Sequence, residues 1–563
     1  MNIILRLQVG FIVTALACVG VGNGARADVV ATNGMVASAN PFATQAGLRT
    51  LKDGGNAIDA AVATGLTLGV VDGHNSGIGG GCFMLIRRAN GEFVAIDGRE
   101  KAPASATRDM FVRKGKADTK LSQTGALASG VPGEVAAFDY AIKKFGRKRF
   151  SDLLMPAAKL AEDGFPLNAG YASRLIANSN DLALFPASRA IFFHEGKLPG
   201  KGDVLKQRDL GATYRAIAQN GSDWFYRGSF AKDTAKWMQA NGGLLTAADF
   251  AGYQIQVREP IRTKYRGYDI VSFPPPSSGG VHVAEMLNIL EPFDLKALDE
   301  ATRWHVIAEA MKLAFADRAF WLGDPDFVKV PRGLVSTEYA ANLSGKIDKR
   351  HAIVVSGHND PPRAESDVFG DKHTTHFSVV DAEGNWVACT ATVNTGFGSK
   401  VVVPGTGVLL NNQMDDFSVE PGVANYFGLV GAEANAVAPG KRPLSSMSPT
   451  IVLKEGKPVI ALGAAGGPKI ISAVLLELVA MLDLGQTPQQ AVAAPRIHQQ
   501  WSPDELMFEK TLPQGVQSAL AARGHRLKEM PVGSNSQIVA RGADGRGFVG
   551  AADPRGGGSA AGW

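Results

Sequence analysis

Residues 373–381 read HTTHFSVVD, and the fold assignment rests on this segment. Residues 375–380 have the composition of a β-strand, and so do residues 386–393, WVACTATV. The residues that join them, 381–385, read DAEGN and are typical of a turn. This pattern predicts a β-hairpin.

The register of this hairpin gathers polar side chains. With the turn centred on Glu383, the numbers of paired residues sum to about 766, which places Thr374 opposite Thr392. Because side chains alternate along a strand, Thr390, Thr392 and Asn394 share one face. Three polar side chains beside a threonine would be unfavourable in a hydrophobic core, and they suit a functional site. The alternative is an ordinary solvated strand face, because threonine is a common strand residue.

Metal binding has little support in the sequence. His373 and His376 lie close to the threonine pair, but two histidines without further ligands are a weak metal signal. Cys82 and Cys389 are far apart in the sequence, and they pair only if the fold brings them together. We therefore predict no metal site and no disulfide framework.

The residues on either side of the hairpin differ in character. Residues 344–372 are mostly polar without an apolar period, which predicts a long exposed connection. The chain after residue 374 favours strands, with short helices near 471–484 and 513–523. The glycines at 556–558 predict a flexible tail.

The residues before the connection favour helices, with one predicted strand pair. The predicted elements are helices at 45–52 and 57–62, strands at 83–86 and 93–96, and a mostly helical section over 124–343. Asn56 is suited to cap the second helix. Because the second half has too few helices to cover its own strands, we expect the two halves to share one core.

The composition is that of a folded, exported protein. The 563 residues carry a formal net charge of +5 without a block of like charge, which gives little support for nucleic-acid binding. Residues 1–27 have the pattern of a signal peptide, with a cleavage site after Ala27. The apolar run at 9–21 is short for a membrane anchor, and a lipoprotein signal at Cys18 is disfavoured by the bulky Leu16. The predicted location is periplasmic or secreted.

Further motifs are long and specific. They are residues 54–61 (GGNAIDAA), 130–133 (GVPG), 322–328 (LGDPDFV), 409–417 (LLNNQMDDF) and 441–450 (KRPLSSMSPT). Together with residues 373–381, and in this order, they resemble the gamma-glutamyltranspeptidase (glutathione hydrolase) family of N-terminal nucleophile hydrolases. The resemblance implies an α/β fold, a four-layer αββα sandwich of two antiparallel sheets covered by helices mainly from the first part of the chain.

The resemblance also implies self-cleavage between His373 and Thr374. The products would be a large chain, 28–373, and a small catalytic chain, 374–563, which remain together as a heterodimer around one core. The hydroxyl of Thr374 would be the nucleophile, with its freed α-amino group as the base. Thr392 would form a hydrogen bond to Thr374 and orient it.

Gly466 and Gly467 resemble the family's oxyanion hole, in which backbone N–H groups stabilise developing negative charge. Pro468 and Lys469 depart from the hydroxyl residue followed by arginine that the family pattern leads us to expect. The alternative interpretation of the two glycines is a plain turn after the strand predicted at 459–462.

Substrate recognition is implied by charge, because a gamma-glutamyl group carries one carboxylate and one ammonium. By resemblance, the carboxylate would be bound by Arg99, Ser445 and Ser446, and the ammonium by Asp416, Gln413 and Asn394. Each residue has a plainer interpretation as a surface ion pair, a turn or a loop. Asp416 favours glutamyl over glutaryl substrates, because a glutaryl group has no ammonium to bind.

Two further segments have other expected roles. Residues 421–432 resemble a lid, with Tyr426 and Phe427 near the position of a gating tyrosine. The glycine run at 77–81 follows a predicted helix and precedes a strand, the reverse of the order in nucleotide-binding loops. We expect this run to allow close backbone packing, and no cofactor is implied.

The predicted function is acyl transfer. Thr374 would take the gamma-glutamyl group from glutathione or a related amide and pass it to water or to an amino acid or peptide acceptor. Two other hypotheses remain. One is a relative of the cephalosporin acylases, which Asp416 disfavours, and the other is a non-catalytic exported binding protein on the same fold.

Overall fold

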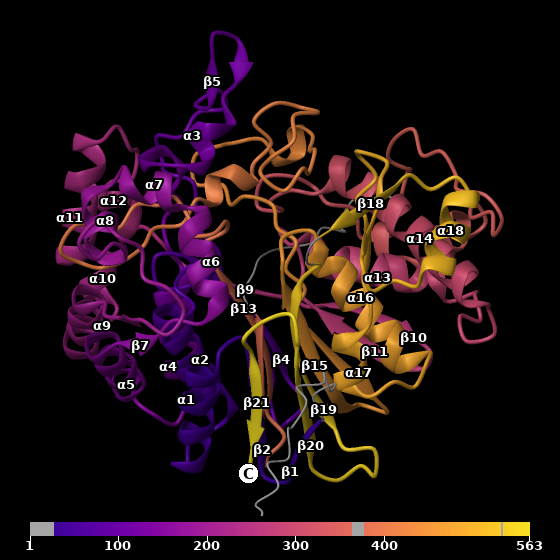
Figure 1. Cartoon of the computed structure of the whole chain (residues 1–563), viewed down its shortest axis with the longest axis horizontal. Helices are drawn as coiled ribbons and strands as arrows, with labels where there is room; N and C mark the ends of the chain where they lie inside the picture. The colour runs from indigo at the N-terminus through magenta and orange to yellow at the C-terminus, as the bar shows by residue number, and fades with distance from the viewer. Residues whose placement is uncertain (1–27, 363–375, 531–532) are drawn as a thin grey trace, which may run out of the picture.

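The computed structural model describes residues 28–362, 376–530 and 533–563, and over these it consists of two face-to-face sheets between layers of helices (Figure 1). One sheet has the order β1 (Val29–Ala31), β20 (Phe548–Ala552), β19 (Asn535–Arg541), β15 (Lys457–Ala465), β14 (Thr450–Lys454), β11 (Tyr268–Ser272) and β10 (Ile261–Tyr265). The other, the hairpin sheet, has the order β21 (Ser559–Gly562), β2 (Gly34–Ser38), β12 (His376–Asp381), β13 (Trp386–Thr392), β3 (Gly81–Arg87), β4 (Phe93–Gly98) and β9 (Gln256–Arg258). This confirms the predicted αββα sandwich.

The helices form the two outer layers. The hairpin sheet is covered by α1 (Pro41–Lys52), α2 (Ala57–Val71) and α4 (Glu134–Phe145), with α5 (Phe150–Asp163) and α9 (Arg208–Asn220) packed outside them. The other sheet is covered by α13 (Ser278–Leu290) and α16 (Lys469–Leu482), with α14 (Glu300–Trp321) packed against α13. Helices before residue 374 therefore dominate, as predicted, but α16 comes from the second half.

The shorter elements complete the surface. The helices are α3 (Thr119–Gln123), α6 (Ala169–Ala177), α7 (Ser179–Ala183), α8 (Pro186–Phe192), α10 (Asp223–Tyr226), α11 (Ser229–Ala240), α12 (Ala247–Ala251), α15 (Thr337–Ser344), α17 (Pro488–Ala493) and α18 (Gln514–Ala522). The strands are β5 (Val112–Arg113), β6 (Lys116–Ala117), β7 (Phe165–Pro166), β8 (Val204–Leu205), β16 (Ile497–Gln499), β17 (Leu506–Glu509) and β18 (Leu527–Met530). The predicted helices near 471–484 and 513–523 correspond to α16 and α18.

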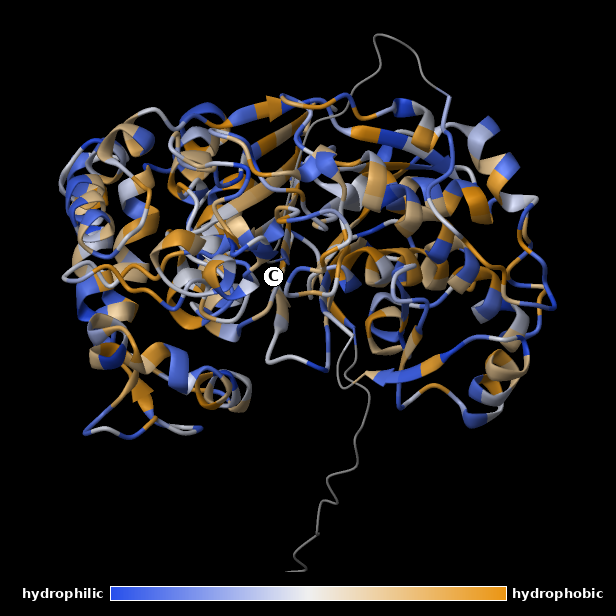
Figure 2. Ribbon diagram, turned by 90° about the horizontal axis from the view of Figure 1, so that it is seen from above, coloured by the Kyte–Doolittle hydropathy of each residue, from blue (hydrophilic) through white to orange (hydrophobic). Residues whose placement is uncertain are grey.

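The hairpin β12–β13 lies in the middle of its sheet, with β2 on one side and β3 on the other. Phe377 and Val379 point towards the helical layer, whereas Val380 and Ala388 pack against the opposite sheet. Figure 2 shows hydrophobic residues recurring along the central strands between the helical layers. Strands and helices from both halves of the chain contribute to this interior, so the two halves share one core.

The predicted elements of the N-terminal region are present. Asn56 caps α2 in a reciprocal arrangement, because its side chain accepts from Asp59 N while the Asp59 carboxylate accepts from Asn56 N. A capping box of this kind satisfies donors that the first turn leaves unpaired. The strand β2 before α1 was not predicted.

The prediction of a flexible C-terminal tail is wrong. Residues 559–562 form β21 at the edge of the hairpin sheet, where Met35 pairs with Gly562. The carbonyl of Trp563 also accepts from the backbone N–H groups of Thr32 and Asn33. Backbone hydrogen bonds to β2 therefore fix a segment whose glycine-rich composition suggested mobility.

Two observations bear on the cysteines and on membrane insertion. Cys82 and Cys389 are buried free thiols on the neighbouring strands β3 and β13. Within residues 28–362, 376–530 and 533–563, no helix combines the length and the apolar character needed to cross a bilayer.

The glycine run at 77–81 packs closely against backbone, as predicted. A Cβ atom added to Gly79 would lie 2.0 Å from the carbonyl oxygen of Leu409, and one added to Gly80 would lie 1.9 Å from that of Thr392. These distances leave no room for any side chain. The run thus places the end of β13 against the loop that precedes β3.

Gly80→Ala is expected to destabilise the protein by about 2 kcal/mol or more, because the new methyl group meets rigid backbone rather than a flexible side chain. The matched control is Gly515→Ala in α18, where an added Cβ meets nothing within 4 Å. Differential scanning fluorimetry compares the two variants. Equal melting temperatures would show that the close approach at Gly80 does not limit stability.

Candidate active site

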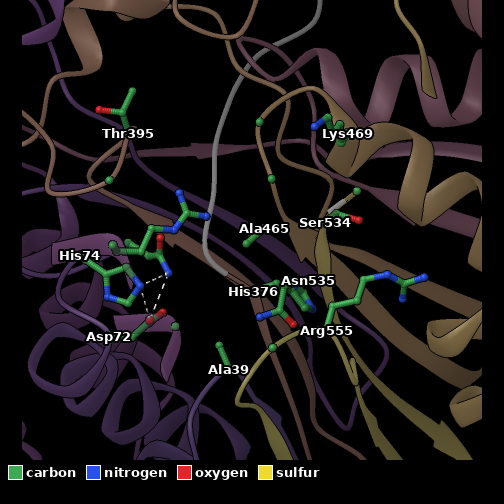
Figure 3. A pocket seen from close by; sticks show the side chains of 18 of the residues that line it. Ala39, Asp72, His74, His376, Thr395, Ala465, Lys469, Ser534, Asn535 and Arg555 are labelled. Carbon is green, nitrogen blue, oxygen red and sulfur yellow. Dashed lines mark hydrogen bonds and ion pairs between the residues drawn. The ribbon is translucent and has the colours of Figure 1, made fainter. Parts of the chain in front are cut away.

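A cavity of about 620 Å³ is lined by residues from both halves of the chain (Figure 3). In the close-up, Asp72 and His74 lie on one side, and Lys469, Ser534 and Arg555 lie on the other. Three of the predicted site residues line this cavity, namely Asn394, Gly466 and Gly467. His376, the first described residue after the predicted cleavage site, also lines it.

The predicted hairpin register is confirmed in the described part of the hairpin. His376 pairs with Thr390, Phe377 with Cys389 and Ser378 with Ala388, so each pair of residue numbers sums to 766. His373 and Thr374 lie outside the described residues. Their pairing and their roles stay predictions that rest on this register.

His376 is buried between two hydroxyl groups at the start of β12. Its Nδ1 lies 3.1 Å from Thr390 Oγ1, and its Nε2 lies 2.8 Å from Ser378 Oγ. Burial lowers the pKa of His376 to about 3, so the ring is neutral at physiological pH. The ring also lies over Gly463, where an added Cβ would come within 2.4 Å of Nδ1. We infer a positioning role for this histidine rather than a metal-binding one.

Thr392 and Asn394 lie at the end of β13. Thr392 Oγ1 accepts a hydrogen bond of 2.7 Å from the backbone N–H of Asn394, and Thr392 pairs with Gly81 in β3. Asn394 has a φ of +79°, a left-handed conformation that asparagine tolerates. Its side chain donates to the carbonyl of Asn412 at 2.9 Å, directly before Gln413. The end of the hairpin is therefore tied to the segment that carries Gln413 and Asp416.

Gly466 and Gly467 form the turn between β15 and α16. Their φ angles of +143° and +60° lie in the region that favours glycine. The turn meets the cavity at the N-terminus of a 14-residue helix, where the helix dipole favours negative charge. The glycines thus form the turn of the plainer interpretation, and an oxyanion hole made by their backbone stays a prediction.

Arg99 and Asp416 form a buried ion pair. Arg99 follows β4, Asp416 ends the 3-10 helix Gln413–Asp416, and a guanidinium nitrogen lies 2.8 Å from Asp416 Oδ2. Burial raises the pKa of Asp416 to about 6, although Arg99 opposes the shift. Arg99 is fully buried, which excludes the surface ion pair of the plainer interpretation.

Ser445 and Ser446 are buried close to this pair. Ser445 Oγ accepts from the backbone N–H of Met447 at 3.1 Å, and the backbone of Ser445 is bound to Pro276 and Ser278. Ser446 Oγ lies 3.4 Å from a guanidinium nitrogen of Arg318, a residue of α14. The two serines therefore join the second half of the chain to the first.

The family model for gamma-glutamyltranspeptidase matches residues 43–563. The chain is 48% identical over 532 residues to the glutathione hydrolase proenzyme of Escherichia coli strain K12, covering 94% of this chain and 91% of the relative. It is 43% identical to the glutathione hydrolase proenzyme of Pseudomonas sp. strain A14, covering 96% of each. This chain belongs to the gamma-glutamyltranspeptidase family.

The fold agrees with that membership. The crystal structure of a cephalosporin acylase from Bacillus halodurans superposes with a TM-score of 0.85 at 30% identity, covering 98% of this chain and 99% of that chain. The likeness extends through both sheets and both helical layers. That acylase therefore shares the architecture of this chain, and substrate preference has to be argued from the site.

Sequence reasoning missed Arg318, which belongs to the same buried group. Its Nε donates to Ser278 Oγ at 3.0 Å, and its charge acts on Asp416. Burial lowers the pKa of Arg318 to about 10, so the side chain stays protonated at neutral pH. An arginine within a long helical pattern gives no sequence signal, because only the packing of α14 brings it to this site.

The predicted lid lies between two cavities. Tyr426 and Phe427 line the large cavity, whereas Asn425 and Leu429 line a smaller one beside Asp416 and Arg318. The ring of Phe427 packs over Gly467, where an added Cβ would lie 2.6 Å from the ring. Asp415 holds this segment, because its Oδ2 accepts from Tyr426 N at 2.9 Å.

Asp415→Ala is expected to loosen the lid, because the backbone of Tyr426 loses its acceptor. Cleavage by chymotrypsin after Tyr426 or Phe427 should then be several-fold faster than in the unaltered protein. The control is Ser122→Ala, which removes the 2.6 Å bond to the other oxygen of Asp415 and a local bond to the carbonyl of Thr119, but leaves the bond to Tyr426 N intact. Equal digestion rates in all three proteins would contradict this role of Asp415.

Proposed function

We propose that this protein is a self-processing gamma-glutamyltransferase and glutathione hydrolase. It transfers the gamma-glutamyl group of glutathione and related amides to water or to amino acid and peptide acceptors. The buried Arg99–Asp416 pair is the observation that carries this proposal. Two opposite charges, held without solvent beside Ser445, Ser446 and Arg318, complement both ends of an amino acid.

Binding exchanges one ion pair for two. The α-carboxylate of the substrate binds the Arg99 guanidinium and accepts hydrogen bonds from the hydroxyl groups of Ser445 and Ser446. The substrate ammonium binds the Asp416 carboxylate, and the side-chain oxygens of Gln413 and Asn394 are further acceptors. Because the site is already desolvated, each new pair interacts more strongly than it would in water. Arg99 and Asp416 separate from each other only when the substrate supplies a carboxylate for the arginine and an ammonium for the aspartate.

The acyl transfer follows from the geometry of the hairpin. In the precursor, the hydroxyl of Thr374 attacks the carbonyl carbon of His373, the peptide bond breaks, and water opens the resulting ester. The freed amine then accepts the hydroxyl proton as Thr374 attacks the gamma-carbonyl of the donor. In the described part of the hairpin, the numbers of paired residues sum to 766. Extended along the strands to residue 374, this register supports Thr392 as the residue that orients Thr374.

The turn at Gly466 and Gly467 supports the next step. Backbone N–H groups at the N-terminus of α16 stabilise the oxyanion of the tetrahedral intermediate. The amine of the donor leaves with a proton, and water or an acceptor amine resolves the ester on Thr374. The 620 Å³ cavity, polar and lined by both halves of the chain, has room for the leaving group and the acceptor.

The precursor and its export belong to the same proposal. The relatives in Escherichia coli and Pseudomonas are named proenzymes, which supports division into chains 28–373 and 374–563. Residues 1–27 lie outside the described part, and their pattern supports export to the periplasm or beyond. The two chains remain together through the core they share.

Thr374→Ala is expected to remain a single chain without activity, because the variant has no hydroxyl to attack residue 373. The unaltered protein should separate on a denaturing gel, and N-terminal sequencing of the smaller band should begin TTHFSVVD. Release of p-nitroaniline from gamma-glutamyl-p-nitroanilide measures turnover. Full turnover by uncut protein would refute the mechanism, and so would a smaller band that begins elsewhere.

The cephalosporin acylase architecture makes glutaryl amides the second candidate substrates. Asp416 distinguishes gamma-glutamyl from glutaryl amides, because a glutaryl group has no ammonium for the Asp416 carboxylate to bind. Asp416→Asn is expected to lower kcat/KM for gamma-glutamyl-p-nitroanilide by about 100-fold, equivalent to about 3 kcal/mol for a lost buried charge pair. The value for glutaryl-p-nitroanilide should change little. An equal loss for both anilides would assign Asp416 a merely structural role.

The same residue gives a pH dependence. Only ionised Asp416 attracts the substrate ammonium, and burial raises its pKa to about 6. Below about pH 6 we therefore expect kcat/KM to fall by a further factor of about ten for each pH unit, in addition to the loss caused by protonation of the Thr374 amine. This additional limb should be absent from the small residual activity of Asp416→Asn, whereas the limb of the amine should remain. The measurement is a pH profile of gamma-glutamyl-p-nitroanilide turnover, and an unchanged limb in the variant would assign it to another group.

A further inference from the structure

A buried cluster of two histidines and a glutamate lies away from the cavity. His305 and Glu309 are one turn apart on α14, and His525 follows α18 (Figure 1). All three side chains are buried, and their potential ligand atoms lie within 4.8 Å of one another. His305 Nδ1 is 2.7 Å from His525 Nε2, which is 3.9 Å from Glu309 Oε1.

Backbone groups hold the outer atoms of two of these side chains. His305 Nε2 lies 2.7 Å from the carbonyl oxygen of Asp348 and donates to it, which leaves Nδ1 as the inward-facing nitrogen. Glu309 Oε2 accepts from the backbone N–H of Ile353 at 2.8 Å, which leaves Oε1 directed at the histidines. Metal-ligating histidines and carboxylates are characteristically fixed by outer hydrogen bonds of this kind.

We propose that His305 Nδ1, Glu309 Oε1 and His525 Nε2 bind one divalent transition-metal ion, for which zinc is the best match. Two imidazoles and one carboxylate form a common zinc ligand set, and a water molecule can supply the fourth ligand. Calcium and magnesium are disfavoured, because they prefer oxygen ligands. The cavity and the residues assigned to acyl transfer are not involved, so the ion has a structural role.

The required movement is small. Two nitrogens bound to tetrahedral zinc are about 3.4 Å apart when each bond is about 2.1 Å long. The two rings therefore separate by about 0.7 Å from their hydrogen-bonded distance of 2.7 Å. Glu309 Oε1 approaches His525 by about 0.5 Å and His305, which lies within 4.8 Å, by at most about 1.4 Å. The proton on His525 Nε2 moves to Nδ1 of the same ring as the ion enters, so both rings bind the ion as neutral imidazoles.

Lys312 balances the remaining charge. Its ammonium lies 3.3 Å from Glu309 Oε1 and 3.3 Å from Asp504 Oδ1, and it donates to the carbonyl of Ile353 at 2.9 Å. A carboxylate oxygen has two lone pairs, so Glu309 Oε1 can accept from Lys312 and bind an ion as well. Two carboxylates therefore surround this ammonium, while the charge of Arg523 also acts on both histidines.

The position of the cluster suggests what the ion stabilises. His305, Glu309 and the backbone at 348–353 precede the predicted cleavage site, whereas His525 follows it. The ion would join the two chains and hold the segment 348–353 that leads towards residue 374. The linking of separate chains rests on the proposed cleavage, but metal binding itself does not.

The test uses the full-length, processed protein and zinc itself. After treatment with a chelator and dialysis, the protein is titrated with Zn²⁺, and bound metal is measured by mass spectrometry. We expect about one tightly held ion per protein and a rise in melting temperature of several degrees. Co²⁺ should give the visible absorption of a four-coordinate site. Less than about a tenth of an ion per protein, with no thermal shift, would overturn the proposal.

His525→Gln should bind Zn²⁺ at least about 100-fold more weakly, because it loses one of three protein ligands. The control is His351→Ala, an exposed histidine in the same segment, which should bind normally. Equal metal content in His525→Gln and the unaltered protein would place the ion elsewhere and refute this site. If His525→Gln fails to fold, the titration of the unaltered protein alone decides. Turnover of gamma-glutamyl-p-nitroanilide is followed in parallel, so failure of the proposed reaction is recognised separately.

Discussion

The arrangement of the site depends on the burial of both faces of the β12–β13 hairpin. Odd-numbered residues such as Phe377 pack against the helices, and even-numbered residues such as Val380 pack against the second sheet. A shift by one residue would exchange these faces and bury His376 among helices. Pairing with β2 and β3 on either side removes the remaining freedom. The register that leads towards Thr374 is thus fixed by the core of the whole molecule.

The proposed substrate-binding residues Arg99, Asp416 and Arg318 differ from the hairpin, because they place charged side chains in the interior, where apolar side chains are normally favoured. Desolvation raises the pKa of Asp416 and lowers that of Arg318, so each ionised form has a free-energy cost in the folded protein. The ion pair between Arg99 and Asp416 offsets part of this cost, and in the proposed binding mode a zwitterionic substrate replaces each partner with an opposite charge of its own. The site is preorganised at the expense of stability, which is a common feature of binding sites for charged groups.

Much of this could be predicted from sequence because the deciding signals are local. The turn DAEGN fixes the hairpin register, Asn56 caps α2, and the glycines at 77–81 predict close backbone packing. Membership in a family supplied the sandwich and the grouping of Arg99 with Asp416, which lie 317 residues apart. Arg318 and the cluster around His305 could not be predicted, because helix packing alone brings these residues to their partners. The C-terminal strand was missed because its residues lack strand character and are fixed by β2.

A chain that cuts itself must hold its two parts together without the bond it breaks. The sheets meet this requirement, since β12, β13 and β21 alternate in one sheet with strands from the first half. Within the second part of the chain, the lid lies between Asp415, which binds Tyr426 N, and the glycine turn at the start of α16, which Phe427 covers. Cleavage can therefore release an amine at residue 374 while the positions of Arg99, Asp416 and Gly467 stay fixed by contacts that do not include the severed bond.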